Sequence, residues 1–306
     1  MRNPGAITMS RLGSSPEMRG GHREQLGELG ARMPRRPRST MDGSGMRIPS
    51  AGLTWHEVFL DIPEAGKSTL DEAVAGNHSI LVVNGLASAA ECQSIRSFAA
   101  DAMQRLNEVK RSTSDMTRQF AGDVGRCRMP VCDNFDSDGQ ALCNLFLLRA
   151  VAHLREEHPV LLANLFGTTL TAAPLCNGNN HVVFSYGEPA VNVYTAGGQF
   201  EPHEDLQSLT VLLNVTGSGA FEGGGTAFWS MLNSGAASEE DAAEVVEPSF
   251  VLRPMEGTAL LFCGRVTHSG QPVRTGERVV FVASLSPMLS PGACVMNTAS
   301  GMAGLF

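Results

Sequence analysis

Charged and aromatic side chains are scarce in this sequence, and it contains no long apolar run. Only 18% of the 306 residues are charged and 6% are aromatic, while 42% are hydrophobic. No run of 18 or more consecutive apolar residues occurs, and the segment MRNPGAITMSRLG lacks the apolar core of a signal peptide. We therefore expect no membrane span and no secretory signal. A chain of this length and hydrophobicity can bury one substantial core.

Cysteine pairs with the spacing of a metal or redox motif are missing as well. The seven cysteines form no CxxC pair and are spread over segments predicted as helix, loop and strand. This pattern favours free thiols in a reducing compartment, with disulfides as the alternative. A soluble intracellular location is therefore favoured, although the sequence does not define the compartment.

Lysine is absent from the first 50 residues, which contain nine Arg and four acidic residues. The rest of the chain carries 14 basic and 27 acidic residues, a net charge of −13. An acidic body of this kind binds nucleic acid poorly, so we expect no nucleic-acid partner. Residues 1–47 show no sustained apolar period, which predicts a disordered leader. Its Arg and Ser content leaves organelle targeting open, although Glu17, Glu24 and Glu28 are unusual for a transit peptide.

Helical patterns dominate the predicted supporting region, residues 48–184. Ser88 and Glu91 have the spacing of a capping box, and apolar residues follow at the helical period up to Leu106. Two further helices are expected, over 142–154 and 160–166. His153 and His158 do not have the spacing of a zinc-protease motif, and we expect them on the surface or on a helix face, not as ligands.

Short β-rich runs separated by Gly, Asn and Pro fill the next region, residues 185–288. Strands are expected within 181–186, 190–194, 209–215, 226–229, 249–252, 258–262 and 278–283. Six or more short strands with turn residues between them indicate a sandwich or a barrel. The fold class is therefore α+β, and residues 289–306 are expected to form a loosely held tail.

One strand-like run, NVYTAGGQFEPHED, ends in a histidine and an aspartate two residues apart. Residues i and i+2 of an extended segment project to the same side, so His203 and Asp205 can bind one metal ion. His268 lies 63 residues after Asp205, at the edge of another β-rich run. Two histidines and one carboxylate form the facial triad of non-haem Fe(II) oxygenases, which leaves coordination positions open. We therefore predict a metal site at His203, Asp205 and His268.

The segment Ser185 to Pro287 resembles the prolyl 4-hydroxylase-like branch of the Fe(II)/2-oxoglutarate dioxygenases. The matching residues are Tyr194, Gly198 and Phe200 before His203-Glu204-Asp205, then Glu222-Gly223-Gly224-Gly225-Thr226, then His268, Gly270, Pro272-Val273 and Gly276-Glu277-Arg278. The resemblance implies a double-stranded β-helix, or jelly-roll, with iron at its open end. It also implies that Arg278 binds the distal carboxylate of 2-oxoglutarate, that Tyr194 hydrogen-bonds the same cosubstrate, and that Thr226 contributes to that site. Prolyl 4-hydroxylases usually carry Lys where Arg278 stands.

The activity implied by this resemblance is hydroxylation coupled to conversion of 2-oxoglutarate and O2 into succinate and CO2. Fe(II) and ascorbate are the expected cofactors, and peptidyl proline is the expected substrate. Hydroxylation of a small molecule, a lipid or another side chain is an alternative on the same core. A jelly-roll that binds a metal or a ligand without catalysis is an alternative of another class. Asp205 argues against halogenating variants, which lack this carboxylate.

Overall fold

The structure is a computed structural model, and it describes residues 40–41, 47–48, 53–60, 74, 76–112, 125–167, 182–230 and 247–287. The chain divides into two compact units, Met1–Met33 and Pro34–Phe306, and all described residues belong to the second. The predicted leader and tail lie outside the described residues, except for a short antiparallel pair formed by β1 (Thr40–Met41) and β2 (Arg47–Ile48). Of the helices described, none is long and apolar enough to cross a membrane.

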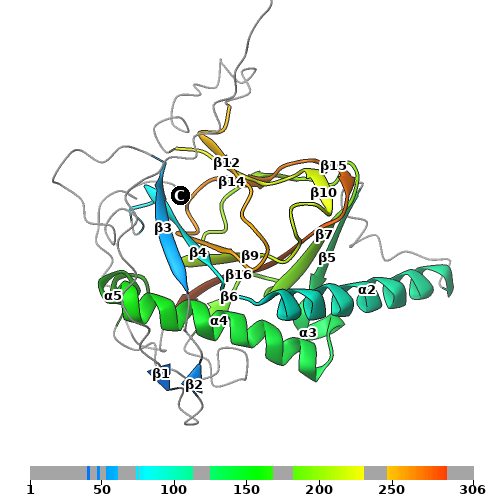
Figure 1. Ribbon diagram of the computed structural model, residues 1–306, viewed down its shortest axis with the longest axis horizontal. Coiled ribbons are helices and arrows are strands. Elements are labelled where there is room, and N and C mark those ends of the chain that lie inside the picture. Colours follow the sequence, from blue (N-terminus) through cyan, green and yellow to red (C-terminus); the bar gives the residue numbers. More distant parts are fainter. Residues whose placement is uncertain are drawn as a thin grey trace, which may run out of the picture. The chain divides into compact units, whose positions relative to one another are not determined.

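A large antiparallel sheet forms the centre of the described part of the chain (Figure 1). Its strands, in spatial order, are β3 (Thr54–Phe59), β4 (Ser79–Asn84), β13 (Ala259–Phe262), β9 (Leu209–Asn214), β16 (Arg278–Pro287), β7 (Ala190–Tyr194) and β5 (Arg126–Pro130). The short strand β6 (Val182–Phe184) pairs with the far end of β16.

A smaller antiparallel sheet faces the large one. It contains, in spatial order, β12 (Phe250–Leu252), β11 (Thr226–Phe228), β14 (His268–Gly270) and β8 (Phe200–His203). A separate hairpin-like pair is formed by β10 (Phe221–Gly223) and β15 (Val273–Gly276). Two antiparallel sheets with strands contributed alternately along the chain are the expected jelly-roll, and the α+β fold is confirmed.

Four helices are described: α2 (Ala89–Ser112), α3 (Val131–Asn134), α4 (Ser137–Glu157) and α5 (Pro159–Phe166). The capping box predicted for α2 is present, because the Ser88 N–H donates to Glu91 Oε2 at 2.8 Å and the Glu91 N–H donates to Ser88 Oγ at 3.3 Å. The helix predicted from residue 142 begins earlier, where Asp136 accepts a hydrogen bond from the Gly139 N–H. Figure 1 shows α2 and α4 on one side of the large sheet and β12 and β14 on the other.

Side chains alternate strictly between the two faces of the large sheet. On β16, Val279, Phe281 and Ala283 belong to the apolar core that the sheet shares with the helices, and the Phe281 ring contacts Phe146 of α4. Arg278 and Val280 point to the opposite face, where a second apolar cluster lies between the sheets. Both faces of this sheet are therefore buried, and the polar residues on its inner face lie inside the molecule.

Two features of the supporting region differ from a simple helical layer. The strands β3, β4 and β5 come from residues 48–184 but belong to the same sheet as β7, β9, β13 and β16. The boundary near residue 185 therefore stays a prediction. His153 and His158 were expected on the surface or on a helix face: His153 lies on α4 and His158 caps it, but neither is on the surface, since their exposures are 3% and 1%. Their rings lie 5.7 Å apart, and His158 also contacts Trp55 edge-on.

Candidate metal centre

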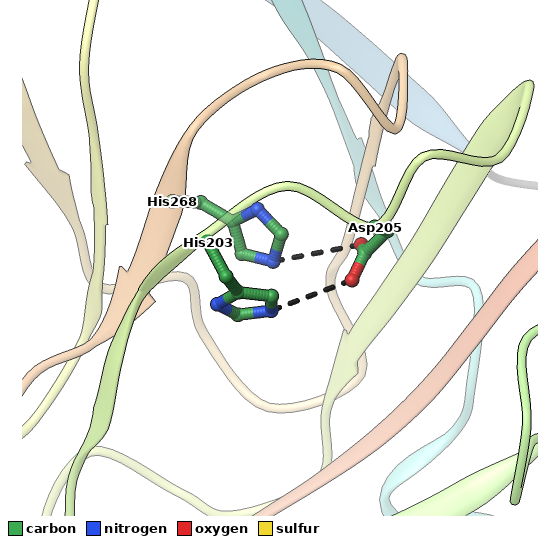
Figure 2. A group of neighbouring side chains, drawn as sticks. All are labelled: His203, Asp205 and His268. Atoms are coloured by element: carbon green, nitrogen blue, oxygen red, sulfur yellow. Dashed lines mark ion pairs between the residues drawn. The ribbon is translucent and has the colours of Figure 1, made fainter. Parts of the chain in front are cut away.

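The two predicted histidine ligands are neighbours on paired strands of the small sheet. His203 ends β8 and His268 begins β14, and the register of the two strands places them directly opposite each other. Their ring centroids are 4.3 Å apart. Asp205 follows β8 and returns its carboxylate to the two rings, as Figure 2 shows. One ligand atom from each residue lies within 4.8 Å of the others.

Backbone carbonyls fix the tautomer of both imidazole rings. His203 Nδ1 lies 2.8 Å from the carbonyl oxygen of Glu201, and His268 Nδ1 lies 3.0 Å from that of Val266. A carbonyl oxygen only accepts hydrogen bonds, so each Nδ1 carries the proton and each Nε2 keeps its lone pair. This arrangement leaves Nε2 available to a metal ion.

The spacing of the donor atoms suits one ion between them. The distances from His203 Nε2 and His268 Nε2 to the Asp205 carboxylate oxygens are 3.4 and 3.6 Å. Ligands at roughly 2.1 Å from an ion in adjacent positions would be about 3 Å apart. The three side chains therefore need only a small contraction to bind the same ion.

Asp205 remains ionised despite its burial. Burial raises its pKa, but a hydrogen bond with His203 and the charge of His268, both of which require the protonated ring, together with a hydrogen bond from Thr210, outweigh this effect and lower the pKa to about 2. Thr210 Oγ1 of β9 donates to Asp205 Oδ2 at 2.6 Å. Burial also lowers the pKa of His268, which favours the neutral imidazole that binds metals. The electrostatics therefore favour an ionised Asp205, and burial favours a neutral His268.

The two histidines differ in their surroundings. His268 has a side-chain exposure of 5% and contacts the rings of Phe228 and Phe262. His203 has a side-chain exposure of 26% and contacts the ring of Phe200, with centroids 4.2 Å apart. The centre is therefore closed on the side of His268 and more open on the side of His203.

Arg278 lies at the start of β16, paired in register with Tyr194 of β7. Its side chain is buried, with 2% exposure. The guanidinium donates to the carbonyl oxygen of Gly225 at 3.0 Å and to Thr226 Oγ1 at 3.1 Å. Burial lowers the pKa of Arg278 to about 10, Tyr194 opposes this shift, and Arg253 adds to it. Within the described residues Arg278 has no carboxylate partner, which is costly for a buried cation.

A cavity of about 130 Å3 connects the buried Arg278 with the three candidate ligands. Tyr194 and Thr226, which were predicted to contact the cosubstrate, both line this cavity. The hydroxyl of Thr226 accepts a hydrogen bond from Arg278, so Thr226 also orients the guanidinium. The structure therefore brings all six predicted site residues to one cavity, and their roles toward ligands remain predictions.

Among the polar residues of the cavity wall that were not predicted from the sequence, three have notable environments. Asn192 of β7 is 4% exposed, and its Oδ1 is buried without a hydrogen-bond partner. Arg128 of β5 donates to Glu188 Oε1 at 2.7 Å, and Glu188 Oε2 also accepts from the backbone N–H of Ser284. Asn192 could have been found from the sequence, because it is a polar residue two positions before Tyr194 in an otherwise apolar strand. Arg128 and Glu188 could not, because their proximity depends on the pairing of β5 with β7.

Comparison with known proteins gives similar structures but no sequence relatives. No protein-family model matches the chain, and no curated protein matches it. A viral collagen prolyl hydroxylase from Paramecium Bursaria Chlorella virus-1, in complex with 2-oxoglutarate, is 14% identical; 71% of this chain and 99% of that chain are covered, with a TM-score of 0.42.

Two bacterial structures are similar at the same level. HygX from Streptomyces hygroscopicus, with nickel, 2-oxoglutarate and hygromycin B bound, is 13% identical over 73% of this chain and 88% of that chain, with a TM-score of 0.39. A prolyl-4-hydroxylase from Pseudomonas putida is 16% identical over 72% of this chain and 100% of that chain, also with a TM-score of 0.39. These structures belong to the class that the sequence motifs resemble. Since the TM-scores lie below 0.5, the assignment of function rests on the geometry of the site.

Proposed function

We propose that this protein is an Fe(II)- and 2-oxoglutarate-dependent dioxygenase that hydroxylates its substrate. One observation carries the proposal: a single cavity is lined both by the His203, Asp205 and His268 donor set and by the buried cation of Arg278, which has no carboxylate partner among the described residues. A metal-binding group and an anion-binding group in the wall of one small cavity suit a dicarboxylate that also chelates a metal.

The donor set fits iron. Two neutral imidazoles and one carboxylate on one side of an ion form the facial triad, which leaves further positions for the cosubstrate and for oxygen. No fourth His, Cys, Asp or Glu joins this group in the part of the chain that the structure describes. Iron bound here would supply activation of O2 coupled to decarboxylation of 2-oxoglutarate.

The rest of the cavity fits the cosubstrate. Arg278 would pair with the distal carboxylate, since a guanidinium held by Gly225 and Thr226 still has N–H groups for a charge-assisted contact. Tyr194 lies next to Arg278 in the register of the large sheet. The unpaired Oδ1 of Asn192 is a second sign that a polar ligand completes this wall, because buried polar atoms are rarely left unpaired.

The chain's own residues would then bind, orient and shield the reactants. The reaction consumes 2-oxoglutarate, O2 and a substrate C–H bond and produces succinate, CO2 and the corresponding alcohol. Phe228 and Phe262 exclude water from the side of His268, so the substrate would approach from the side of His203. Thr210 holds the Asp205 carboxylate in place from the large sheet.

Peptidyl proline is the substrate class that we propose, on the basis of the sequence motifs, with ascorbate as a further cofactor. The residues that line the cavity include an ion pair of Arg128 with Glu188 and the fully exposed Tyr186, which a peptide substrate could contact. A small molecule, a lipid or another side chain stays the alternative substrate. A protein that binds metal and ligand without turnover is the alternative of another class.

The test is succinate release by the full chain with Fe(II), 2-oxoglutarate and O2, measured against proline-containing peptides and a panel of metabolites. His203→Ala, Asp205→Ala and His268→Ala should each lose Fe(II) binding or nearly all turnover, while His78→Ala, at an exposed histidine outside the cavity, should keep both. Wild-type succinate release by Asp205→Ala would refute the triad. A protein that binds Fe(II) and 2-oxoglutarate but releases no succinate with any substrate would be the non-catalytic alternative.

A further inference from the structure

We infer that Arg126 is a positioning residue for the metal centre, which acts on His203 through the ring of Phe200. This inference rests on the proposed function, because it concerns how one candidate ligand is held. Arg126 is neither one of the candidate ligands nor one of the residues that line the cavity, but the Phe200 ring that it contacts does line the cavity. Its effect would therefore be on the orientation of His203 and on metal affinity, not on the binding of 2-oxoglutarate.

Arg126 lies where the two sheets come close at their edges. Its strand, β5, is the last strand of the large sheet, and β8, which carries Phe200 and His203, is the last strand of the small sheet. Arg126 pairs in register with Tyr194, so its side chain is on the inner face of the large sheet. The next residue, Cys127, packs against the core on the helical side. The side chain of Arg126 therefore reaches from one sheet edge toward the other.

The contact that Arg126 makes there is a cation–π contact. Its Cζ lies 3.8 Å from the centroid of the Phe200 ring. The Phe200 ring in turn lies 4.2 Å from the imidazole of His203, at an interplanar angle of 50°. Phe200 is also close to Gly270, where an added Cβ would lie 3.3 Å from Phe200 Cβ. Phe200 is therefore held between Arg126, His203 and the backbone of β14.

His203 depends on this contact more than His268 does on any one neighbour. His268 is nearly inaccessible and contacts two phenylalanine rings. Apart from His268, the only ring that contacts His203 within the described residues is Phe200. The hydrogen bond from Nδ1 to Glu201 fixes the tautomer, but a single hydrogen bond leaves the tilt of the ring free. Packing against Phe200 restricts that tilt.

The backbone at Arg126 is anchored to the turn that leads into β8. The carbonyl oxygen of Gly125 accepts hydrogen bonds from the Thr195 N–H at 2.7 Å and from Thr195 Oγ1 at 3.3 Å. A Cβ on Gly198 would lie 2.0 Å from the same oxygen, so the two segments approach as closely as glycine allows. The backbone that carries the Arg126 side chain is therefore held in a fixed position relative to Phe200.

The experiment titrates the metal-free full chain with Co(II), in place of Fe(II), and follows binding and ligand geometry by the visible absorption of the bound ion. Arg126→Met, which keeps length but removes the charge, should weaken Co(II) binding about three- to tenfold and change the absorption spectrum. Arg126→Lys should recover part of the affinity. Phe200→Leu should weaken binding similarly, and the double variant should bind no more weakly than the more affected single variant. Arg105→Met, on the exposed part of α2, is the matched control and should bind as the unaltered protein does.

Three results would overturn the inference. Folded Arg126→Met with unchanged Co(II) affinity and spectrum would show that the contact does not position His203. Additive effects of Arg126→Met and Phe200→Leu would show that Arg126 does not act through Phe200. An increase in the 2-oxoglutarate KM with unchanged Co(II) affinity would make Arg126 a cosubstrate residue. If Arg126→Met does not fold, Arg126→Gln, which also removes the charge, replaces it, and equality with the unaltered protein would again contradict the inference. Failure of the unaltered protein to bind Co(II) would instead refute the proposed function.

Discussion

Replacing Arg278 by alanine should separate cosubstrate binding from metal binding. Arg278 is 2% exposed and is held by the Gly225 carbonyl and by Thr226, without an acidic partner in the described part of the chain. Its burial without an anion costs free energy in the ligand-free protein, so its removal need not unfold the chain. What the variant loses is the buried cation that lines the same cavity as the candidate metal ligands.

The expected loss can be estimated from this environment. A charge-assisted contact to a carboxylate contributes roughly 1.5 to 3 kcal/mol, and a bidentate contact in a dry site lies at the upper end or somewhat above it. Loss of about 2 to 4 kcal/mol corresponds to roughly thirty- to a thousandfold weaker binding of 2-oxoglutarate. Arg278→Lys should recover part of this, because a lysine ammonium keeps the charge but cannot reproduce the planar fork.

The assay measures 2-oxoglutarate affinity and Co(II) affinity in parallel, with thermal unfolding as a check on the fold. Arg278→Ala should weaken the first strongly and leave the second nearly unchanged. Arg265 and Arg274, which also flank His268, are both exposed, and alanine at either should change neither affinity appreciably. If folded Arg278→Ala bound 2-oxoglutarate as tightly as the unaltered protein, the assignment of the anion site to Arg278 would be wrong.

Two further predictions concern stability. Burial, and secondly the charge of His158, lower the pKa of His153 from 6.5 to about 4, so below pH 6.5 the unfolded chain takes up a proton that the folded chain does not. The free energy of unfolding should therefore fall by up to roughly 3 kcal/mol between pH 6.5 and 4. In urea unfolding at pH 7 and pH 5, His153→Leu should reduce the dependence of this free energy on pH. An unchanged pH dependence would contradict the attribution to His153. Gly198→Ala should destabilise the fold markedly in thermal unfolding, because its Cβ would lie 2.0 Å from the Gly125 oxygen; an unchanged Tm would show that the turn can shift.

Local signals in the sequence predicted some elements well. The start of α2 depends on Ser88 and Glu91 alone, three residues apart, and the capping box is present. Strands such as 190–194 and 278–283 are apolar on both faces and were recognised for that reason. The strand β5, with the sequence RCRMP, was missed because two arginines and a proline give no strand pattern. It is a strand because it pairs with β7.

The residues of the candidate site likewise include some that local sequence signals predicted and others that they did not. The spacing of His203 and Asp205 on an extended segment, and the motif around His268 and Arg278, were sufficient to predict which residues meet. The hydrogen bond from Thr210 to Asp205 and the ion pair of Arg128 with Glu188 were not predictable, because each joins strands whose alignment only the folded sheet defines. Whether a histidine is exposed or buried could not be predicted from the sequence either, since nothing in the helical segment alone shows that Trp55 of β3 packs against His158.

Because side chains alternate between the two faces of β16, this single strand contributes both to the apolar core and to the cavity. Val279, Phe281 and Ala283 contribute to the core shared with the helices, whereas Arg278, Val280 and Val282 line the cavity. Substitutions at the first set change how much of the chain is folded, and substitutions at the second change what the cavity binds. Specificity and stability can therefore diverge independently in this protein, one residue at a time, within the same ten-residue strand.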